Sequence, residues 1–206
     1  MIAYILGAIG SGKSTTAKLL AEETKSVLYE EKFEDNEHLE DFYEALRLGK
    51  DTKKVLEGVQ ISFMHEYQHL GREIERHYTS KNMVIDAGPL AGMAFVETHH
   101  HLNQIHPAFY KVYKMFWEYY FLEQDRLKKE SSKFILIKRD PSDLLSKIDK
   151  RGREMEKGIT PEYLDLLQYN YEKLLREHFA DSWSGIIASP EENETSVLRV
   201  VRACIR

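Results

Sequence analysis

The chain begins with a short apolar run that leads directly into a glycine-rich segment. Residues 2–6, IAYIL, have the composition of a buried strand, and residues 7–15, GAIGSGKST, follow without a break. Glycine adopts backbone conformations that strain other residues, so repeated glycines allow a loop to fold its N–H groups around an anion. Apolar residues recur after this loop, which predicts a helix whose N-terminus adds partial positive charge at the same place.

The spacing of these residues is G-x-x-x-x-G-K-S, the P-loop pattern. A tight turn without a ligand is the alternative, but the strand before the pattern and the helix after it are the context that a nucleotide site requires. Lys13 is expected to reach the β- and γ-phosphates of ATP, and the Ser14 hydroxyl to ligate Mg²⁺. We predict nucleotide contacts from seven residues of this segment: Gly7, Gly10, Ser11, Gly12, Lys13, Ser14 and Thr15.

Length and composition fit a single cytoplasmic domain. The 206 residues can form one α/β domain with a buried core, which we expect to span 1–206. The net charge of −5 gives no indication of a nucleic-acid partner. The single cysteine, Cys204, excludes an intrachain disulfide and fits a reducing compartment. No apolar run reaches the roughly 18 residues that span a bilayer, so we expect no membrane association.

Histidines cluster within residues 98–106, which include His99-His100-His101. Imidazoles bind metals, but neither cysteines nor a carboxylate pattern completes a site here. We therefore expect this segment to be a solvated loop.

Strand-like and helix-like segments alternate along the chain. Apolar runs predict strands at 2–6, 27–30, 82–86, 133–138 and 184–188. Helical periodicity covers 13–24, 51–78, 107–130, 141–151, 160–178 and 194–204. This alternation predicts an α/β fold, a doubly wound five-stranded parallel sheet with helices on both faces. In such sheets ligands bind beyond the carboxyl ends of the strands.

Four polar segments are candidates for that site. The segment Glu30-Glu31-Lys32 comes at the end of the second strand, where a carboxylate is placed to accept a proton from an attacking hydroxyl, although acidic loops are common in so charged a chain. Gln60 has an amide that can pair with a nucleobase edge, unless it lies on the surface. Asp86 ends the third strand, where it would hold Mg²⁺ or cap a turn. Arg151 and Arg153 follow a helix and would close over phosphates, or form a solvated turn.

These elements in this order resemble the deoxyribonucleoside kinases. The resemblance rests on the P-loop, L-x-E-E at 28–31, Phe42-Tyr43, the helix with Gln60, a strand that ends in Asp86, and R-G-R-x-x-E at 151–156. It extends from Ile2 to about Leu175. The P-loop is common to many NTPases, whereas the later elements at these separations are far more specific.

The resemblance implies a catalytic role for several of these residues. Glu31 matches the general base that takes the proton of the sugar 5′-OH. Lys13, Arg151 and Arg153 match the residues around the transferred phosphoryl group, the two arginines being part of a lid at about 150–160.

It also implies a mode of substrate binding. Tyr43 matches the tyrosine that hydrogen-bonds the 3′-OH, and Glu156 matches the lid carboxylate that shares this hydroxyl. Gln60 matches the glutamine that pairs with the base. The stretch through Asp35-Asn36 to Phe42-Tyr43 is more similar to the bacterial purine-preferring kinases, so we expect a deoxyadenosine or deoxyguanosine substrate.

The chain departs from the family at two positions near the 5′-OH. The family follows its third strand with an arginine that helps to hold the general base, and here Asp86 is followed by Ala87-Gly88. The family also often has proline after the base, where this chain has Lys32. These departures leave open an altered acceptor pocket.

Three hypotheses for function are distinguishable at this stage. The first is a kinase that phosphorylates the 5′-OH of a deoxyribonucleoside. The second is a nucleoside-monophosphate kinase of the thymidylate kinase type, whose dianionic acceptor needs cations rather than a base; the pair Glu30-Glu31 counts against it. The third is a nucleotide-dependent switch, for which a guanine-recognition motif after a strand is missing.

The segment 107–130 has an unusual number of aromatic residues, spread too widely around a helix for one core stripe. We predict that one face of this helix packs on the sheet and another forms a homodimer interface.

Overall fold

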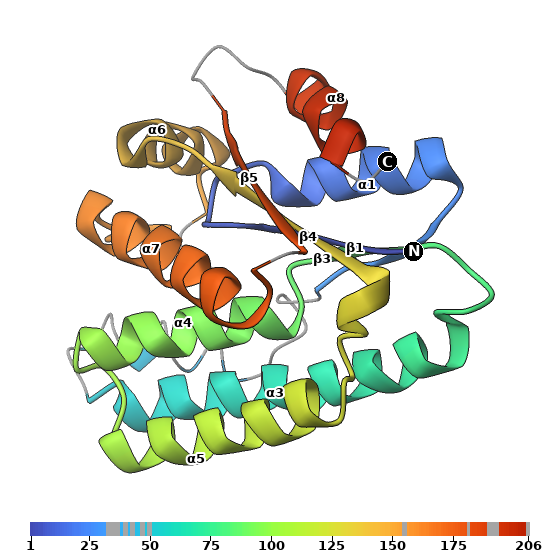
Figure 1. Ribbon diagram of the computed structural model, residues 1–206. Coiled ribbons are helices and arrows are strands. Elements are labelled where there is room, and N and C mark those ends of the chain that lie inside the picture. Colours follow the sequence, from blue (N-terminus) through green and yellow to red (C-terminus); the bar gives the residue numbers. More distant parts are fainter. Residues whose placement is uncertain are drawn as a thin grey trace.

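The computed structural model is a sheet between two layers of helices (Figure 1). It describes residues 1–31, 38, 41, 44–45, 48, 51–153, 156–180, 182–188 and 194–204. Tyr43 and Lys32, which the sequence singled out, lie outside these described residues.

The five predicted strands form one parallel sheet, as expected. They are β1 (Ile2–Gly7), β2 (Val27–Tyr29), β3 (Met83–Asp86), β4 (Ser132–Lys138) and β5 (Trp183–Ile187), in the order β2-β3-β1-β4-β5. The central position of β1 places the loop after Gly7 in the middle of the carboxyl edge. Ile5 of β1 pairs with Asp86, so the end of β3 lies beside that loop.

Helices cover both faces of the sheet. Their bounds are α1 (Lys13–Thr24), α3 (Lys53–His77), α4 (Pro89–His101), α5 (Pro107–Trp117), α6 (Pro141–Arg151), α7 (Pro161–His178) and α8 (Glu194–Cys204). The α1 and α8 helices lie on one face, whereas α3, α4, α5 and α7 lie on the other (Figure 1). No helix in the described part of the chain is both long enough and apolar enough to cross a membrane.

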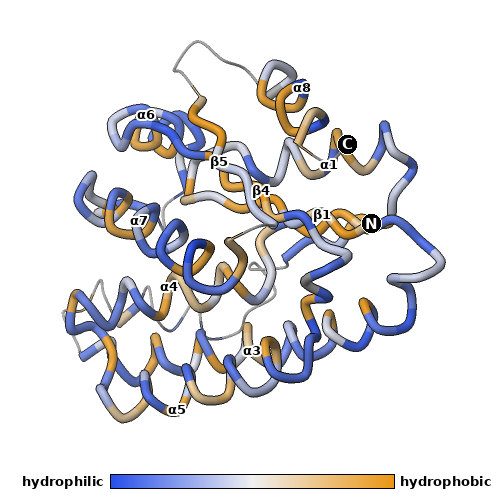
Figure 2. The backbone as a smooth tube through the Cα atoms, in the orientation of Figure 1, coloured by the Kyte–Doolittle hydropathy of each residue, from blue (hydrophilic) through white to orange (hydrophobic). Residues whose placement is uncertain are grey.

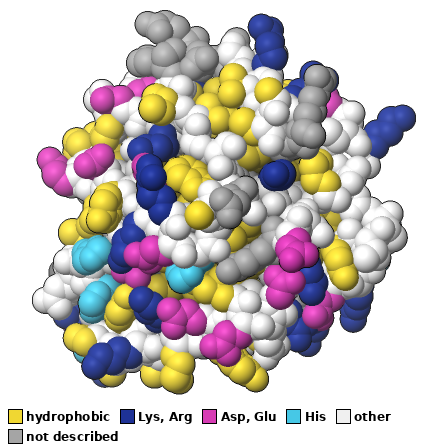
Figure 3. All heavy atoms as spheres, in the orientation of Figure 1, with side chains coloured by type: hydrophobic (Ala, Val, Ile, Leu, Met, Phe, Trp, Pro, Cys, Tyr) yellow, Lys and Arg dark blue, Asp and Glu magenta, His cyan; other side chains and the backbone are white. Residues whose placement is uncertain are grey.

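The alternation of side chains along β1 explains the two cores. Ala3 and Ile5 face the α1 and α8 side, whereas Tyr4 and Leu6 face the larger core beneath α4 and α7. Because both faces are covered, the strand is apolar throughout rather than alternating. Figure 2 shows this hydrophobic centre, and Figure 3 shows acidic and basic side chains interspersed over the surface on one side.

The prediction of a solvated loop at residues 98–106 is wrong for its first part. Residues 89–101 form α4, and His99 is buried in its last turns. This helix contacts α3, α5 and α7 and is buried on nearly every side, so its sequence has no amphipathic stripe by which to detect it. His100 stacks on Tyr110 with ring centroids 3.9 Å apart.

The expected single helix at 107–130 is also wrong in part. The α5 helix ends at Trp117 and continues as a π-helical turn over Glu118–Glu123. Asp125 and Lys128 then adopt left-handed backbone conformations, which end the helical run. Trp117 and Phe121 are four residues apart and both buried, which is the spacing of an α-helix. The sequence pattern therefore continues through the π-helical turn, although the hydrogen bonds there differ.

Candidate active site

A cavity of about 650 Å³ opens at the carboxyl edge of the sheet. Residues from the P-loop, the end of β2, α3, the end of β3, α4, the lid and α7 surround it. The sequence-predicted residues that line it are Lys13, Ser14, Glu31, Gln60, Asp86, Arg151, Arg153 and Glu156. The predicted residues Gly7, Gly10, Ser11, Gly12 and Thr15 belong to the adjoining loop and α1 without lining the cavity.

The P-loop has the backbone that its glycines predict. Gly10 and Gly12 have φ angles of 82° and 89°, in the left-handed region. A Cβ atom on Gly10 would lie 2.9 Å from the Leu144 carbonyl oxygen, so a larger residue would collide with α6. The α1 helix begins at Lys13 with neither a side-chain cap nor an acidic residue in its first turn. Its first N–H groups therefore suit an anionic ligand.

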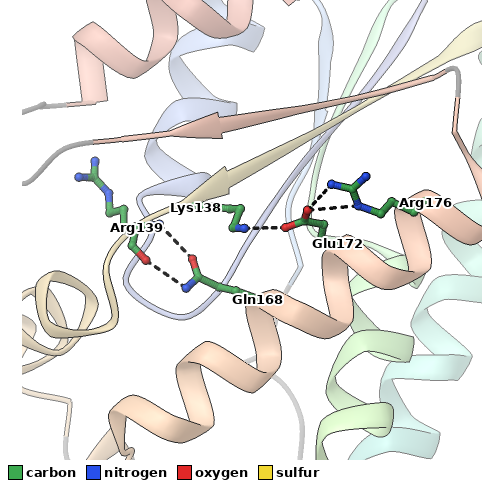
Figure 4. A network of polar contacts seen from close by, with 5 residues as sticks. All are labelled: Lys138, Arg139, Gln168, Glu172 and Arg176. Carbon is green, nitrogen blue, oxygen red and sulfur yellow. Dashed lines mark hydrogen bonds and ion pairs between the residues drawn. The ribbon is translucent and has the colours of Figure 1, made fainter.

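Arg139 anchors this loop, a role that the sequence analysis missed. Its buried guanidinium donates from Nε to the Ser11 carbonyl at 3.1 Å and pairs through Nη1 with Asp143 at 3.1 Å. The Gln168 amide makes two 3.0 Å hydrogen bonds with the backbone N–H and carbonyl of Arg139 (Figure 4). These contacts fix the P-loop to the end of β4 and to α7. The signal for this role in the sequence is the position of Arg139, a charged residue directly after an apolar strand.

The two glutamates after β2 point in different directions. Glu30 is exposed and pairs with Lys18 at 2.8 Å. Glu31 lines the cavity, and its carboxylate accepts a hydrogen bond from the Tyr67 hydroxyl of α3. Of the two carboxylates, the one that the resemblance assigned as base is therefore the one at the cavity.

Burial raises the pKa of Glu31 from 4.5 to about 7. The negative charges of Asp86 and Glu66 act in the same direction, whereas the hydrogen bond from Tyr67 and the charge of Lys13 oppose the rise. A carboxyl group with a pKa near neutrality is well matched to proton transfer at physiological pH.

Asp86 has the properties of a cation ligand. Its side chain is 5% exposed, and its Oδ1 has no hydrogen-bond partner among the described residues. Carboxylate and hydroxyl oxygens are the donors that Mg²⁺ prefers, and Ser14 lines the same cavity. The residues present thus fit a magnesium ion.

Gln60 lies on the α3 wall of the cavity. It is 4% exposed, and its Oε1 also has no hydrogen-bond partner in the described part of the chain. A buried amide oxygen without a partner is costly, so a ligand that donates a hydrogen bond would satisfy it. Phe63 on α3 and Phe95 on α4 also line the cavity and supply flat apolar surface.

The sequence analysis did not assign His99 and Gln104 to the site. Both line the cavity, and their side chains are joined by a 2.8 Å hydrogen bond. Burial lowers the pKa of His99, which keeps the imidazole neutral at pH 7. The histidine cluster was visible in the sequence, but the burial of His99 depends on the packing of α4.

The Glu156 carboxylate is held by the two arginines that precede it. Arg151 donates from Nε to Glu156 at 3.1 Å, and Nη1 of Arg153 lies 3.8 Å from the same carboxylate. Glu156 is buried beneath them. These three residues thus bring two positive charges and one negative charge to the cavity.

A phosphate-binding loop at the centre of a parallel sheet, with a carboxylate and arginines across one cavity, defines a P-loop phosphotransferase. Comparison with known proteins identifies its family. The family model for deoxynucleoside kinases matches residues 4–202. The chain belongs to the deoxynucleoside kinase family.

Individual relatives agree with this assignment. The chain is 30% identical to the deoxyguanosine kinase of Bacillus subtilis (strain 168) over 175 residues, which cover 84% of this chain and 77% of the relative. Two structures of the deoxyadenosine kinase from M. mycoides have the same fold. The one with the products dCMP and a flexible dCDP has a TM-score of 0.75 and 21% identity over 98% of this chain and 97% of that one. The one with bound dATP has a TM-score of 0.75 and 23% identity over 98% of each chain.

The predicted fold and kinase class are therefore confirmed. The family match also favours the deoxynucleoside kinase hypothesis over the monophosphate kinase and the nucleotide switch.

Proposed function

We propose that this kinase transfers the γ-phosphoryl group of ATP to the 5′-OH of a purine deoxyribonucleoside. The observation that carries the proposal is the cavity itself, in which Glu31, with its pKa raised to about 7, faces the same space as Lys13 of the P-loop. The similarity to a deoxyguanosine kinase supports the choice of a purine.

In this proposal Glu31 accepts the proton of the 5′-OH as that oxygen attacks the γ-phosphorus. Lys13, Arg151 and Arg153 stabilise the negative charge of the phosphoryl group. Ser14 and Asp86 would hold Mg²⁺, which neutralises charge on the ATP phosphates when it is bound.

Gln60 recognises the nucleobase in the same proposal. Because Tyr67 follows it by seven residues on α3, their positions are about 10 Å apart along the helix axis. A nucleoside along α3 would have its base at Gln60 and its 5′-OH near Glu31. Glu156 would contact the 3′-OH together with Tyr43, and this requires Glu156 to give up part of its pairing with Arg151.

We also infer a homodimer and a cytoplasmic location. The α5 helix and the turn after it present Val112, Met115 and Tyr119, which are 61%, 65% and 56% exposed. An exposed apolar stripe at this spacing is typical of a surface that a second subunit covers. A reducing compartment with ATP suits both the single cysteine and the substrate.

Turnover of a panel of compounds tests the proposed function. ATP consumption is measured with Mg²⁺ and each of the four deoxyribonucleosides, beside their 5′-monophosphates. We expect turnover with nucleosides, fastest for a purine. Turnover with monophosphates alone would contradict the proposal and would mean that Ala87 marks a changed acceptor pocket.

A further inference from the structure

The hydroxyl of Tyr67 is directed at the carboxylate of Glu31. Tyr67 lies on α3, is 2% exposed, and donates its hydrogen bond to Oε1 of Glu31. Its ring is nearly parallel to that of Phe63, with centroids 6.2 Å apart and planes inclined by 18°. The hydroxyl is thus held by a ring with little freedom to move, because the side chain is buried in the core.

Gly92 on α4 creates the space for this ring. A Cβ atom at position 92 would lie 2.6 Å from Cε2 of Tyr67 and 2.8 Å from the hydroxyl oxygen of Tyr113. Real Cβ contacts are not this short, so any larger residue would displace the tyrosine or the helix. Gly92 lies inside α4, where no turn requires a glycine. The absence of its side chain instead lets Tyr67 approach the cavity.

The carboxylate needs a partner at this position. Lys13 is the cation that acts on Glu31, whereas the charges of Asp86 and Glu66 repel its ionised form. The residues after β3, Ala87 and Gly88, have no side chain that can donate a hydrogen bond. Burial raises the pKa of Tyr67 well above its ordinary value, so its hydroxyl remains a donor at any working pH.

We propose that Tyr67 is a positioning residue for the general base, holding Oε1 of Glu31 so that Oε2 faces the hydroxyl of the nucleoside. This rests on the proposed role of Glu31. Hydrogen bonds to charged groups are stronger than neutral ones, and a base that is misaligned by a small distance transfers protons poorly.

A double-mutant cycle with Tyr67→Phe and Glu31→Gln tests this inference. We expect Tyr67→Phe to lower kcat roughly tenfold to a hundredfold, the worth of one hydrogen bond to a charged group, with the KM of ATP and nucleoside changed by less than about twofold. In the Glu31→Gln background the same change should have almost no further effect on kcat, because the group through which it acts is already lost.

Tyr113→Phe is the matched control. Tyr113 is also buried against Gly92, and its hydroxyl has no hydrogen-bond partner among the described residues. This variant should keep its kcat, and its thermal midpoint shows what the loss of a buried hydroxyl does to stability. If Tyr67→Phe does not fold, Gly92→Ala, which pushes the same ring away from Glu31, replaces it in the cycle.

The outcomes separate the two proposals. Suppose that Glu31→Gln lowers kcat, but that Tyr67→Phe leaves kcat unchanged or lowers it by the same factor in both backgrounds. The positioning role of Tyr67 is then wrong, whereas the assignment of Glu31 as the base is supported. If Glu31→Gln leaves kcat intact, the assignment of the base fails and the inference fails with it.

Discussion

At the scale of single residues, two adjacent glutamates have opposite surroundings. Glu31 lines the cavity and is hydrogen-bonded to Tyr67, whereas Glu30 is exposed and paired with Lys18. A difference of one residue in position therefore decides which carboxylate lines the cavity.

The first prediction compares these two residues. Glu31→Gln should lower kcat by roughly two to four decades, the usual worth of a general base. Glu30→Gln removes the same charge from the same segment and should change kcat by less than about threefold, since exposed ion pairs contribute little. Steady-state kinetics of both variants is the measurement, and equal effects would contradict the assignment.

The second prediction concerns pH. Glu31 must be ionised to accept a proton, so kcat/KM for the nucleoside should fall tenfold per pH unit below about pH 7 and level off above it. A pH profile with an acid limb near the ordinary carboxyl pKa of 4.5 would contradict it.

The same shift has a consequence for stability. A carboxyl whose pKa is raised in the folded state binds its proton more tightly there than in the unfolded chain. Its contribution to stability is complete below about pH 4.5 and is lost as the pH rises through about 7. Glu31→Gln mimics the protonated form, so this variant should unfold at a higher temperature than the native protein at pH 8, by roughly 2–6 °C.

At the scale of elements, the P-loop depends on β4, α6 and α7 as well as on β1 and α1. Arg139 joins the Ser11 carbonyl to Asp143 of α6. Gln168 of α7 holds the backbone of Arg139, as Figure 4 shows. The geometry of the phosphate site is therefore set partly by residues far along the chain.

The third prediction uses the network in Figure 4. Arg139→Gln leaves the mostly covered Asp143 carboxylate and a loop carbonyl without their buried partner, so it should destabilise the fold by about 3–5 kcal/mol and raise the KM of ATP. Arg176→Gln is the control, because its pairing with Glu172 is exposed and should contribute less than about 1 kcal/mol. Urea unfolding and ATP kinetics are measured for both variants. Equal losses of stability would contradict the role of Arg139 in holding the P-loop.

At the scale of the whole molecule, the exposed apolar stripe of Val112, Met115 and Tyr119 is the proposed dimer surface. The α5 helix lies on the opposite side of the sheet from α8 (Figure 1).

The fourth prediction tests the dimer. Light scattering should give twice the chain mass at micromolar concentration. Met115→Asp should shift this to the single-chain mass, because a charge buried without a partner opposes association. Val200→Asp places the same charge on the exposed side of α8 and should leave the mass unchanged. A native protein with the mass of one chain would contradict the proposal.

Much of this fold was predictable because its signals are local. The apolar run before the P-loop and the runs that end at Asp86 and Lys138 are each contiguous in the sequence, and their lengths and compositions indicate parallel strands. The α4 helix was not predictable in this way. It is buried on nearly every side, and a helix without a polar face has no periodicity to detect.

Local sequence signals predict the strand–loop–helix at the N-terminus, the five-stranded parallel sheet, and the residue types that could act on a phosphoryl group. Which of these residues come into contact depends on the packing of the whole chain. Tyr67 and Glu31 are 36 positions apart, and Arg139 and Ser11 are 128 apart. No local pattern connects such pairs, because their contact depends on how α3, α4 and β4 pack around the cavity. The physical reason is that a hydrogen bond needs two groups within about 3 Å, and only the packed fold sets that distance.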